Sequence, residues 1–530
     1  MAATGTSMSV PDPARPLPAL PESHVPSAQE TAELARGGRT SFFGYVLRLA
    51  ARFPFLFIAG RLYGAESLGR FAYATMVVEL VAMLATLGLK RGLAEAMAAR
   101  PDDQTNALYD SLLVSLIAAL IGAALLIALP QIVFPATQYA PLERWFPLII
   151  LAIVASDISL AGLAFRFDIA ATVRARSLVE PWVLSIAALA LAFTALKADG
   201  LIIAYLLSMV AAAAASLWPA FARFGPPQGW RPHPGALWAL ARRNMALAGA
   251  DIAEWGARRL DIFILGRFAP AEIVGIYYVA QQIASLPQRL KSSFDPILAP
   301  VLATNIAEGR RTKAALHIRQ IGFWVGTAQL GVVLALGITG QAGMGLFGPI
   351  FATGVVILAL LLLAELFAAQ AAVAEAALVY VARGRNLVWS LVGITIQAGL
   401  SLLLVPRYGG EGAAGALAIS ALILSVAKSR LLARLLAHPV AGWRWSLVLA
   451  GLPAFGVGLL VLRTPEPVQL TLGLVAILGS FGGLIWRFGF KGADRLLFSR
   501  SLRGKDYPAD APDSSSPDSS SPASPAQTKL

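Results

Sequence analysis

The sequence predicts an all-α polytopic membrane protein with about fourteen transmembrane helices, built as two parallel six-helix lobes and two extra C-terminal helices. Three observations support this class: the composition, the length of the apolar runs and an internal repeat. Of the 530 residues, 57% are hydrophobic and 14% are charged, whereas soluble domains carry about 25% charged residues. The apolar runs can cross a ~30 Å hydrocarbon core as helices. They are far longer than the ~10-residue alternating segments of a membrane β-barrel, so helices are expected.

The apolar runs place the expected spans along most of the chain. In order they are 40–62, 68–90, 107–134, 144–165, 178–196, 200–222, 243–266, 272–296, 316–339, 350–381, 386–405, 412–433, 443–462 and 468–487. The Pro-rich segment 1–39 and the Ser/Pro-rich segment 507–530 have the composition of disordered tails.

Lys and Arg residues are distributed unevenly over the loops between these spans. Loops after even-numbered spans hold about 20 basic residues and loops after odd-numbered spans about 7, and basic loops stay on the cytoplasmic side of a membrane. Both termini are therefore expected in the cytoplasm, and an even number of spans agrees with their lying on the same side. The formal net charge of +13 is explained by these loops, and binding of nucleic acid is not predicted.

One stretch of the chain occurs twice. Residues 57–71 read FIAGRLYGAESLGRF, and residues 263–277, 206 positions later, read FILGRFAPAEIVGIY. Each copy joins the first two spans of a six-span set, and because six is even both sets face the same way, as parallel repeats. The predicted division is 1–39, a cytoplasmic tail; 40–222, the N-lobe; 223–242, a cytoplasmic linker; 243–433, the C-lobe; 443–487, spans thirteen and fourteen; and 507–530, a second cytoplasmic tail.

The residues shared by the two copies have local structural roles. Arg61 and Arg267 end a span, where a long side chain can reach the headgroups. Gly69 and Gly275 occupy the same place in each copy and permit a close approach of neighbouring helices. The repeated hairpin is therefore interpreted as a folding corner and not as a binding site.

The residue content excludes several kinds of site. The chain has no cysteine and four histidines, and the histidines lack the HExxH spacing of a metalloenzyme. No GxxxxGK[ST] loop for ATP is present. No catalytic residue, metal site or cofactor is predicted, apart from coupling to H⁺ or Na⁺.

Arginines inside the predicted spans are the candidate substrate ligands. Arg48 and Arg52 lie on one face of span one, and the 206-residue offset places Arg52 on Arg258 of span seven. Arg289 follows in span eight. Charges at membrane depth usually face a cavity or a partner, and arginine suits phosphate recognition. Arg48 could instead reach the cytoplasmic interface.

Span seven also carries acidic residues. Asp251, Glu254, Arg258 and Asp261 fall along one helical stripe, and Glu254 precedes Arg258 in the favourable order for an ion pair. Two interpretations stay open: these residues line the substrate cavity, or they form an internal salt-bridge network. Elsewhere Asp157 and Glu365 are candidates for ion coupling, because burial raises the affinity of a carboxylate for protons.

Several motifs resemble one known family. GRLYGAESLGRFAYA from residue 60, LGL at 87–89, RGLAEA at 91–96 and the segment 261–303 resemble the oligosaccharide (O-antigen, Wzx-type) flippases of the multidrug/oligosaccharidyl-lipid/polysaccharide (MOP) exporter superfamily. The resemblance covers about 40–435. Typical O-antigen flippases have two spans fewer than this chain, whereas lipid II flippases of the same superfamily share its number, so the subfamily stays open.

The resemblance implies a V-shaped (MATE-like) transporter of the bacterial inner membrane that works by alternating access. Its cargo would be polyprenyl-pyrophosphate-linked oligosaccharide units for exopolysaccharide, capsule or O-antigen (lipopolysaccharide) synthesis, and its partners would be membrane lipids and other polysaccharide assembly proteins. Two alternatives remain at this point: a cation-coupled multidrug exporter of the same superfamily, and a polysaccharide polymerase or ligase. The arginines disfavour cationic drugs, and the short outer loops disfavour an enzyme, so none is predicted.

Overall fold

The computed structural model describes residues 53–135, 143–292, 302, 305–306, 308–490 and 494. Every regular element in these residues is a helix, as the apolar runs predict. The two predicted tails, together with Arg48 and Arg52, lie outside the described residues.

The N-lobe is an antiparallel set of helices. After a helical segment from Phe53 that ends in a π-helical turn, Ala59–Tyr63, it consists of α2 (Gly64–Ala85), α3 (Leu89–Ala98), α4 (Gln104–Ala128), α5 (Ile149–Phe165), α6 (Ile169–Thr172), the π-helix Val173–Val179, α7 (Glu180–Leu191) and α8 (Gly200–Phe224). Between α2 and α3, Leu87 and Gly88 have positive φ values of 51° and 75°. This break separates the span α2 from the short helix α3, which carries Lys90 and Arg91.

The second half begins with a long helix. The elements are α9 (Pro234–Phe268), α10 (Ala271–Ser292), α12 (Arg311–Ile338), α13 (Gly340–Gly345), α14 (Val355–Val381), α15 (Arg383–Leu436), α16 (Trp445–Val461), α17 (Glu466–Val468) and α18 (Leu474–Leu484), and α18 continues into a π-helical turn, Ile485–Gly489. Gly409 in α15 has φ 53° and ψ −128°, and this turn divides α15 where the sequence separates spans eleven and twelve.

Eight helical segments of the described chain are long and apolar enough to cross a membrane. Two of them, Phe53–Ala98 and Arg383–Leu436, contain 46 and 54 residues, more than one ~20-residue span needs. A helix occupies each predicted span, the first being described from Phe53 onward. The all-helical membrane fold is confirmed, and the count of fourteen spans stays a prediction.

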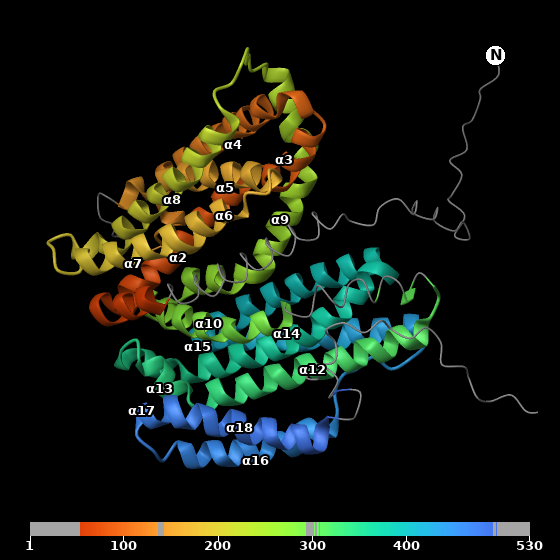
Figure 1. The fold of residues 1–530 in the computed structure, drawn as a ribbon. Helices are drawn as coiled ribbons and strands as arrows, with labels where there is room; N and C mark the ends of the chain where they lie inside the picture. Colours follow the sequence, from red (N-terminus) through yellow and green to blue (C-terminus); the bar gives the residue numbers. More distant parts are fainter. Residues whose placement is uncertain are drawn as a thin grey trace, which may run out of the picture.

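The helices form two groups that diverge from one end (Figure 1). Helices α2 to α8 make the upper group, α10 to α15 make the lower group, and α16 and α18 lie beyond α12 on the flank away from the N-lobe. Helix α9 runs from the upper group to the lower one (Figure 1) and packs against α2, α3 and α4 as well as α15. The groups meet where α2 packs against α10.

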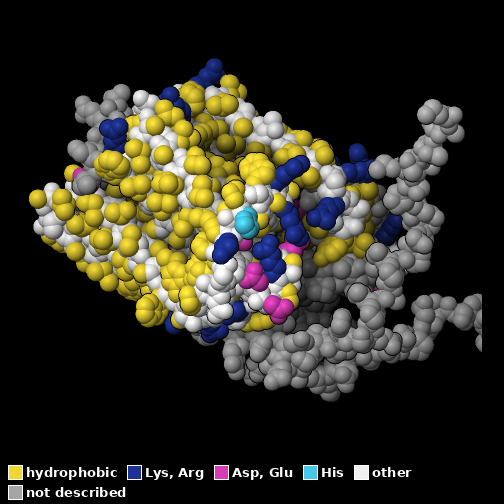
Figure 2. Space-filling view, turned by 90° about the horizontal axis from the view of Figure 1, so that it is seen from above, with side chains coloured by type: hydrophobic (Ala, Val, Ile, Leu, Met, Phe, Trp, Pro, Cys, Tyr) yellow, Lys and Arg dark blue, Asp and Glu magenta, His cyan; other side chains and the backbone are white. Residues whose placement is uncertain are grey.

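Apolar side chains cover most of the visible surface, while Lys and Arg side chains gather toward one end (Figure 2). On α16, for example, Leu449 and Leu452 are 66% and 65% exposed. Large exposed apolar areas of this kind mark a surface that contacts protein or lipid, which agrees with a multi-pass membrane protein.

Candidate functional site: the contacts between the two halves

The two copies of the repeated hairpin touch each other. A Cβ atom added to Gly69 would overlap the carbonyl oxygen of Ala271 and lie 2.7 Å from the backbone nitrogen of Gly275. A Cβ atom added to Gly275 would overlap the carbonyl oxygen of Ala65 and lie 3.0 Å from the nitrogen of Gly69. Because Ala65 and Ala271 are also repeat equivalents, the contact is pseudo-symmetric. The backbones of α2 and α10 meet here with no side chain between them.

A second equivalent pair of glycines extends this contact. A Cβ atom on Gly60 would overlap the carbonyl oxygen of Phe347, and one on Gly266 would overlap the ring of Tyr73. The Tyr73 ring stacks on Phe263 with centroids 6.3 Å apart. We call the contacts of Gly60, Gly69, Gly266 and Gly275 the glycine seam.

Arg61 also takes part in the contact between the halves. Its Nε donates a hydrogen bond of 2.9 Å to the carbonyl oxygen of Leu346, and its guanidinium lies over the Phe57 ring, 5.4 Å from the centroid. The hairpin is thus a folding corner, as predicted, and in addition it joins the two halves, which its sequence alone did not indicate.

The opposite part of α9 binds the N-lobe through charged side chains. Nε of Arg91, on α3, lies 3.0 Å from a carboxylate oxygen of Asp251 on α9, and Arg243 pairs with Glu95. Gly92 lies directly against the side chain of Asn244. Asp251 is buried, so this predicted cavity residue forms a helix–helix ion pair in the structure.

Asp261 lies further along α9 and faces α10. Its carboxylate accepts hydrogen bonds of 2.6 Å from the Tyr277 hydroxyl and 3.1 Å from Nε2 of Gln281. The side chain is 1% exposed. The second carboxylate oxygen of Asp261 and Oε1 of Gln281 are buried without a hydrogen-bond partner in the described part of the chain. Asp261 and Gln281 are thus hydrogen-bonded to each other, and each has one buried oxygen without a donor. A proton or a small cation bound here would supply the missing partner.

The N-lobe interior contains a charged cluster that sequence reasoning found only in part. Asp157 on α5 pairs with Arg176 and, at 3.3 Å, with Lys90 on α3. Arg176 also lies 3.0 Å from Glu180, one helical turn later. Arg176 falls between the predicted spans 144–165 and 178–196 and is therefore one of the basic residues assigned to loops, but it lies in a π-helix and its side chain is 16% exposed. The i, i+4 spacing of Arg176 and Glu180 is the signal that could have identified it.

The second coupling candidate, Glu365, is half-buried on α14 and has interactions of its own. Nearly three turns further along the same helix, Glu375 pairs at 2.9 Å with Lys428 of α15, whose side chain is 1% exposed. Lys428 also donates a hydrogen bond of 3.0 Å to Ser390. Each lobe therefore contains a buried cation held by a carboxylate.

Several predicted ligands are not placed by the structure. Arg48 and Arg52 lie outside the described residues, and so do the side chains of Glu254, Arg258 and Arg289, whose backbones belong to α9 and α10. Their roles stay predictions. Of the span-seven stripe, the structure describes the side chains of Asp251 and Asp261, which contact different helices, α3 and α10.

Comparison with known proteins agrees with this architecture. A family model described as "Polysaccharide biosynthesis protein" matches residues 58–321, a segment that contains both copies of the hairpin except Phe57. The lipid II flippase MurJ in its inward closed conformation superimposes with a TM-score of 0.68 at 14% identity, covering 86% of this chain and 99% of that one. The chain has the fold of the MOP transporters.

Two further structures of this MOP fold are similar to the chain. An inward-facing multidrug resistance MATE family transporter of the MOP superfamily matches with a TM-score of 0.57 at 16% identity, covering 74% of this chain and 94% of that chain. A MATE transporter in its bent conformation gives 0.51 at 15% identity, with 77% and 95% covered. No curated protein sequence matches the chain.

These findings confirm the resemblance to the MOP polysaccharide flippases. The similar solved structures are a flippase and transporters, not enzymes, so the polymerase or ligase alternative is not supported. The protein is a multi-pass membrane protein with the fold of the MOP transporters.

Proposed function

We propose that this protein is a flippase that moves polyprenyl-pyrophosphate-linked oligosaccharide units from the cytoplasmic to the outer leaflet of the bacterial inner membrane. The units would serve exopolysaccharide, capsule or O-antigen synthesis. The glycine seam is the observation that carries the proposal. It joins two repeated lobes at one end through uncharged backbone surfaces, while the lobes diverge toward the other end. Lobes joined in this way can rock between two states, as alternating access requires.

The family resemblance supports a glycan cargo. The matching family model is described as a polysaccharide biosynthesis protein, and MurJ is a flippase for lipid II. A pyrophosphate-linked sugar needs a cationic, hydrated cavity, and Arg48, Arg52, Arg258 and Arg289 are the proposed ligands of its phosphates. In the proposed orientation, with both termini cytoplasmic, the seam closes the outer end and the lobes open to the cytoplasm, where the cargo is made.

The distribution of the cargo between leaflets tests the proposal. A strain that lacks the protein should accumulate complete, unpolymerised lipid-linked units on the cytoplasmic side, measured by their accessibility to a glycan-specific reagent in right-side-out and inverted vesicles. Re-expression of the Arg52→Gln/Arg258→Gln variant, inserted at normal levels, should not restore flipping. Accumulation in the outer leaflet would contradict a flippase function.

Asp261 is the proposed coupling residue, since its carboxylate has neutral hydrogen-bond donors and an unsatisfied oxygen. The earlier candidate Asp157 is paired with two cations in this state and is less suited to exchange a proton. Asp261→Asn should abolish the dependence of transport on a proton or Na⁺ gradient in proteoliposomes while the protein still folds. If transport by the variant still depended on the gradient, Asp261 would be excluded as the coupling residue, and Glu365 would be the next candidate.

A multidrug exporter is the second candidate, favoured by the fold match to a multidrug resistance MATE family transporter. The two functions differ in cargo. Export of cationic dyes from cells that express the protein, together with normal distribution of lipid-linked glycans in its absence, would favour the exporter.

A further inference from the structure

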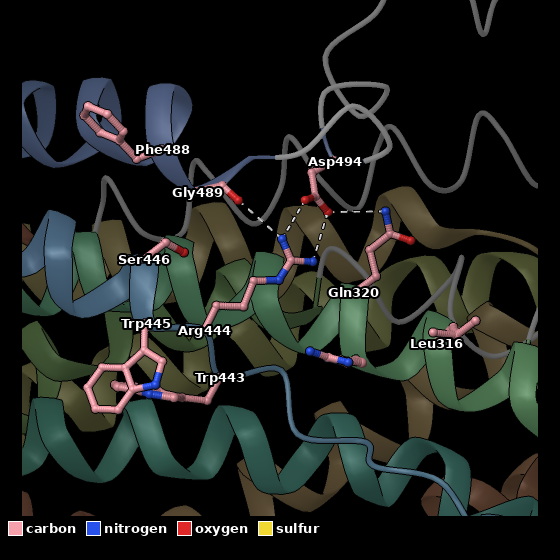
Figure 3. Close-up of a pocket in the computed structure, with 10 residues that line it drawn as sticks. Leu316, Gln320, Trp443, Arg444, Trp445, Ser446, Phe488, Gly489 and Asp494 are labelled. Carbon is pink, nitrogen blue, oxygen red and sulfur yellow. Dashed lines mark hydrogen bonds and ion pairs between the residues drawn. The ribbon is translucent and has the colours of Figure 1, made fainter.

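We propose that a groove on the C-terminal flank binds the phosphate headgroup of an anionic phospholipid. The groove lies between α12, the start of α16 and the end of α18, and its volume is about 620 Å³ (Figure 3). Its lining includes Arg319 and Gln320 of α12, Trp443 and Ser446 around the start of α16, and Phe488. It is distinct from the space between the lobes, because α16 and α18 lie on the flank away from the N-lobe (Figure 1).

One side of the groove is formed by a hydrogen-bonded network around Arg444 and Asp494. Arg444 donates a hydrogen bond of 2.7 Å to Asp494 and one of 3.3 Å to the carbonyl oxygen of Gly489, and its guanidinium lies 3.8 Å from the centroid of Phe323. Asp494 also accepts hydrogen bonds of 3.0 Å from Trp324 and 3.3 Å from Gln320. Figure 3 shows the bonds from Arg444 and Gln320 converging on the Asp494 carboxylate. The charge of Asp494 is thus paired with Arg444.

Two polar groups in the groove have no partner among the residues that the structure describes. Arg319 is exposed and makes no ion pair or hydrogen bond with the part of the chain that the structure describes. The hydroxyl oxygen of Ser446 is buried and has no hydrogen-bond partner in that part either. A cation and a hydroxyl donor in one groove fit a phosphate, which accepts charge-assisted hydrogen bonds.

The aromatic residues around the groove indicate a lipid and not a soluble phosphate. Trp443, Trp445 and Phe488 are 57%, 78% and 66% exposed, and Trp residues at helix ends occupy the headgroup level of a bilayer. The groove lies near the starts of α12 and α16 and the end of α18, on the side of the membrane predicted to be cytoplasmic. Basic pockets between helices on that side bind anionic headgroups. This site does not depend on the identity of the transported cargo.

Native mass spectrometry of the full chain, titrated with phosphatidylglycerol or phosphatidylcholine, tests the site. We expect phosphatidylglycerol to bind at least about tenfold more tightly than phosphatidylcholine, since one charge-assisted contact accounts for roughly that factor. Arg319→Ala should remove this preference, and Ser446→Ala should weaken the binding of phosphatidylglycerol by about threefold, as for one neutral hydrogen bond.

Arg311→Ala is the matched control, because Arg311 is exposed on the same helix about 12 Å before Arg319 and does not line the groove. It should bind phosphatidylglycerol as the wild type does. Equal losses in Arg311→Ala and Arg319→Ala, or no preference between the two lipids in the wild type, would overturn the proposal. Displacement of phosphatidylglycerol by equimolar glycerol phosphate would also overturn it, by showing a site for soluble phosphates.

Discussion

The glycine seam and the contact between α3 and α9 join the same two halves by different physical means. At the seam, Gly69 and Gly275 bring backbones together without an intervening side chain, and no ion pair joins the described residues there. At the α3–α9 contact, Arg91 and Arg243 pair with carboxylates although they are 52% and 60% exposed. The seam depends on shape, which tolerates no added atom, whereas the ion pairs depend on charge and are screened by salt.

The difference assigns different tasks to the two contacts. Helix α9 belongs to both: Asp251 binds the N-lobe and Gly266 contacts Tyr73 at the seam. Ion pairs of partly exposed side chains can lengthen gradually and exchange partners, so they suit a tether that follows motion. A close-packed backbone contact is either made or broken, because packed surfaces are bistable. The seam is therefore suited to be the gate and the α3–α9 contact the tether.

The largest expected effect is from a methyl group in the seam. Gly69→Ala should reduce transport at least about tenfold and lower the free energy of unfolding by about 1–3 kcal/mol, because the added carbon overlaps the Ala271 carbonyl oxygen. Gly399→Ala is the control, since nothing lies within 4 Å of a Cβ atom at this exposed helical glycine, and alanine favours a helix. For both variants, flux into proteoliposomes measures transport and thermal unfolding measures stability. Equal transport and equal stability of the two variants would show that the seam does not differ from an ordinary helix surface.

The next effect concerns charges inside a lobe. Arg176→Gln should lower the free energy of unfolding by about 3–5 kcal/mol, since it leaves the buried carboxylates of Asp157 and Glu180 without their shared cation. The double variant Asp157→Asn/Arg176→Gln should recover part of that loss, measured by denaturant unfolding in the same detergent. A double variant less stable than Arg176→Gln would show that the cluster has another role.

The smallest effect is expected at the tether. Arg243→Gln should lower the free energy of unfolding by less than about 1 kcal/mol, because Arg243 and its partner Glu95 are both more than half exposed. In 1 M NaCl, where the Debye length is about 3 Å, wild type and variant should unfold alike. A larger loss that persists in high salt would mean that the α3–α9 contact is held by packing, as the seam is.

The sequence predicts most of the fold, because span length and the parallel repeat are properties of apolar runs and spacing. It predicts that Gly69 and Gly275 permit close helix packing, but a local pattern contains no information about which helices meet across 206 residues. The sequence also placed the break at Leu87 and Gly88 inside a predicted span. This break separates α3 from α2, and Arg91 of α3 pairs with Asp251, a contact distant in sequence that a local pattern does not show.

The sequence predicts less of the candidate site than of the fold. A charged residue was treated as a cavity residue when it fell inside an apolar run and as a loop residue when it fell outside one. Arg176 lies just before the apolar run of α7 and yet is buried by neighbouring helices. Asp251 lies inside a run and yet pairs with an arginine of another helix. Helix packing decides these cases, and it depends on contacts distant in sequence.

Cross-linking across the seam tests the central claim most directly, because the chain has no cysteine of its own. Arg61→Cys/Leu346→Cys places two thiols where the native arginine reaches the Leu346 carbonyl oxygen, within range of a short reducible cross-linker. Arg100→Cys/Asp110→Cys, at an ion pair inside the N-lobe, is the control. We expect the cross-linker to stop transport in the first variant, reduction to restore it, and the control to transport throughout. Normal transport by protein fully cross-linked between residues 61 and 346 would contradict the assignment of the seam as the gate.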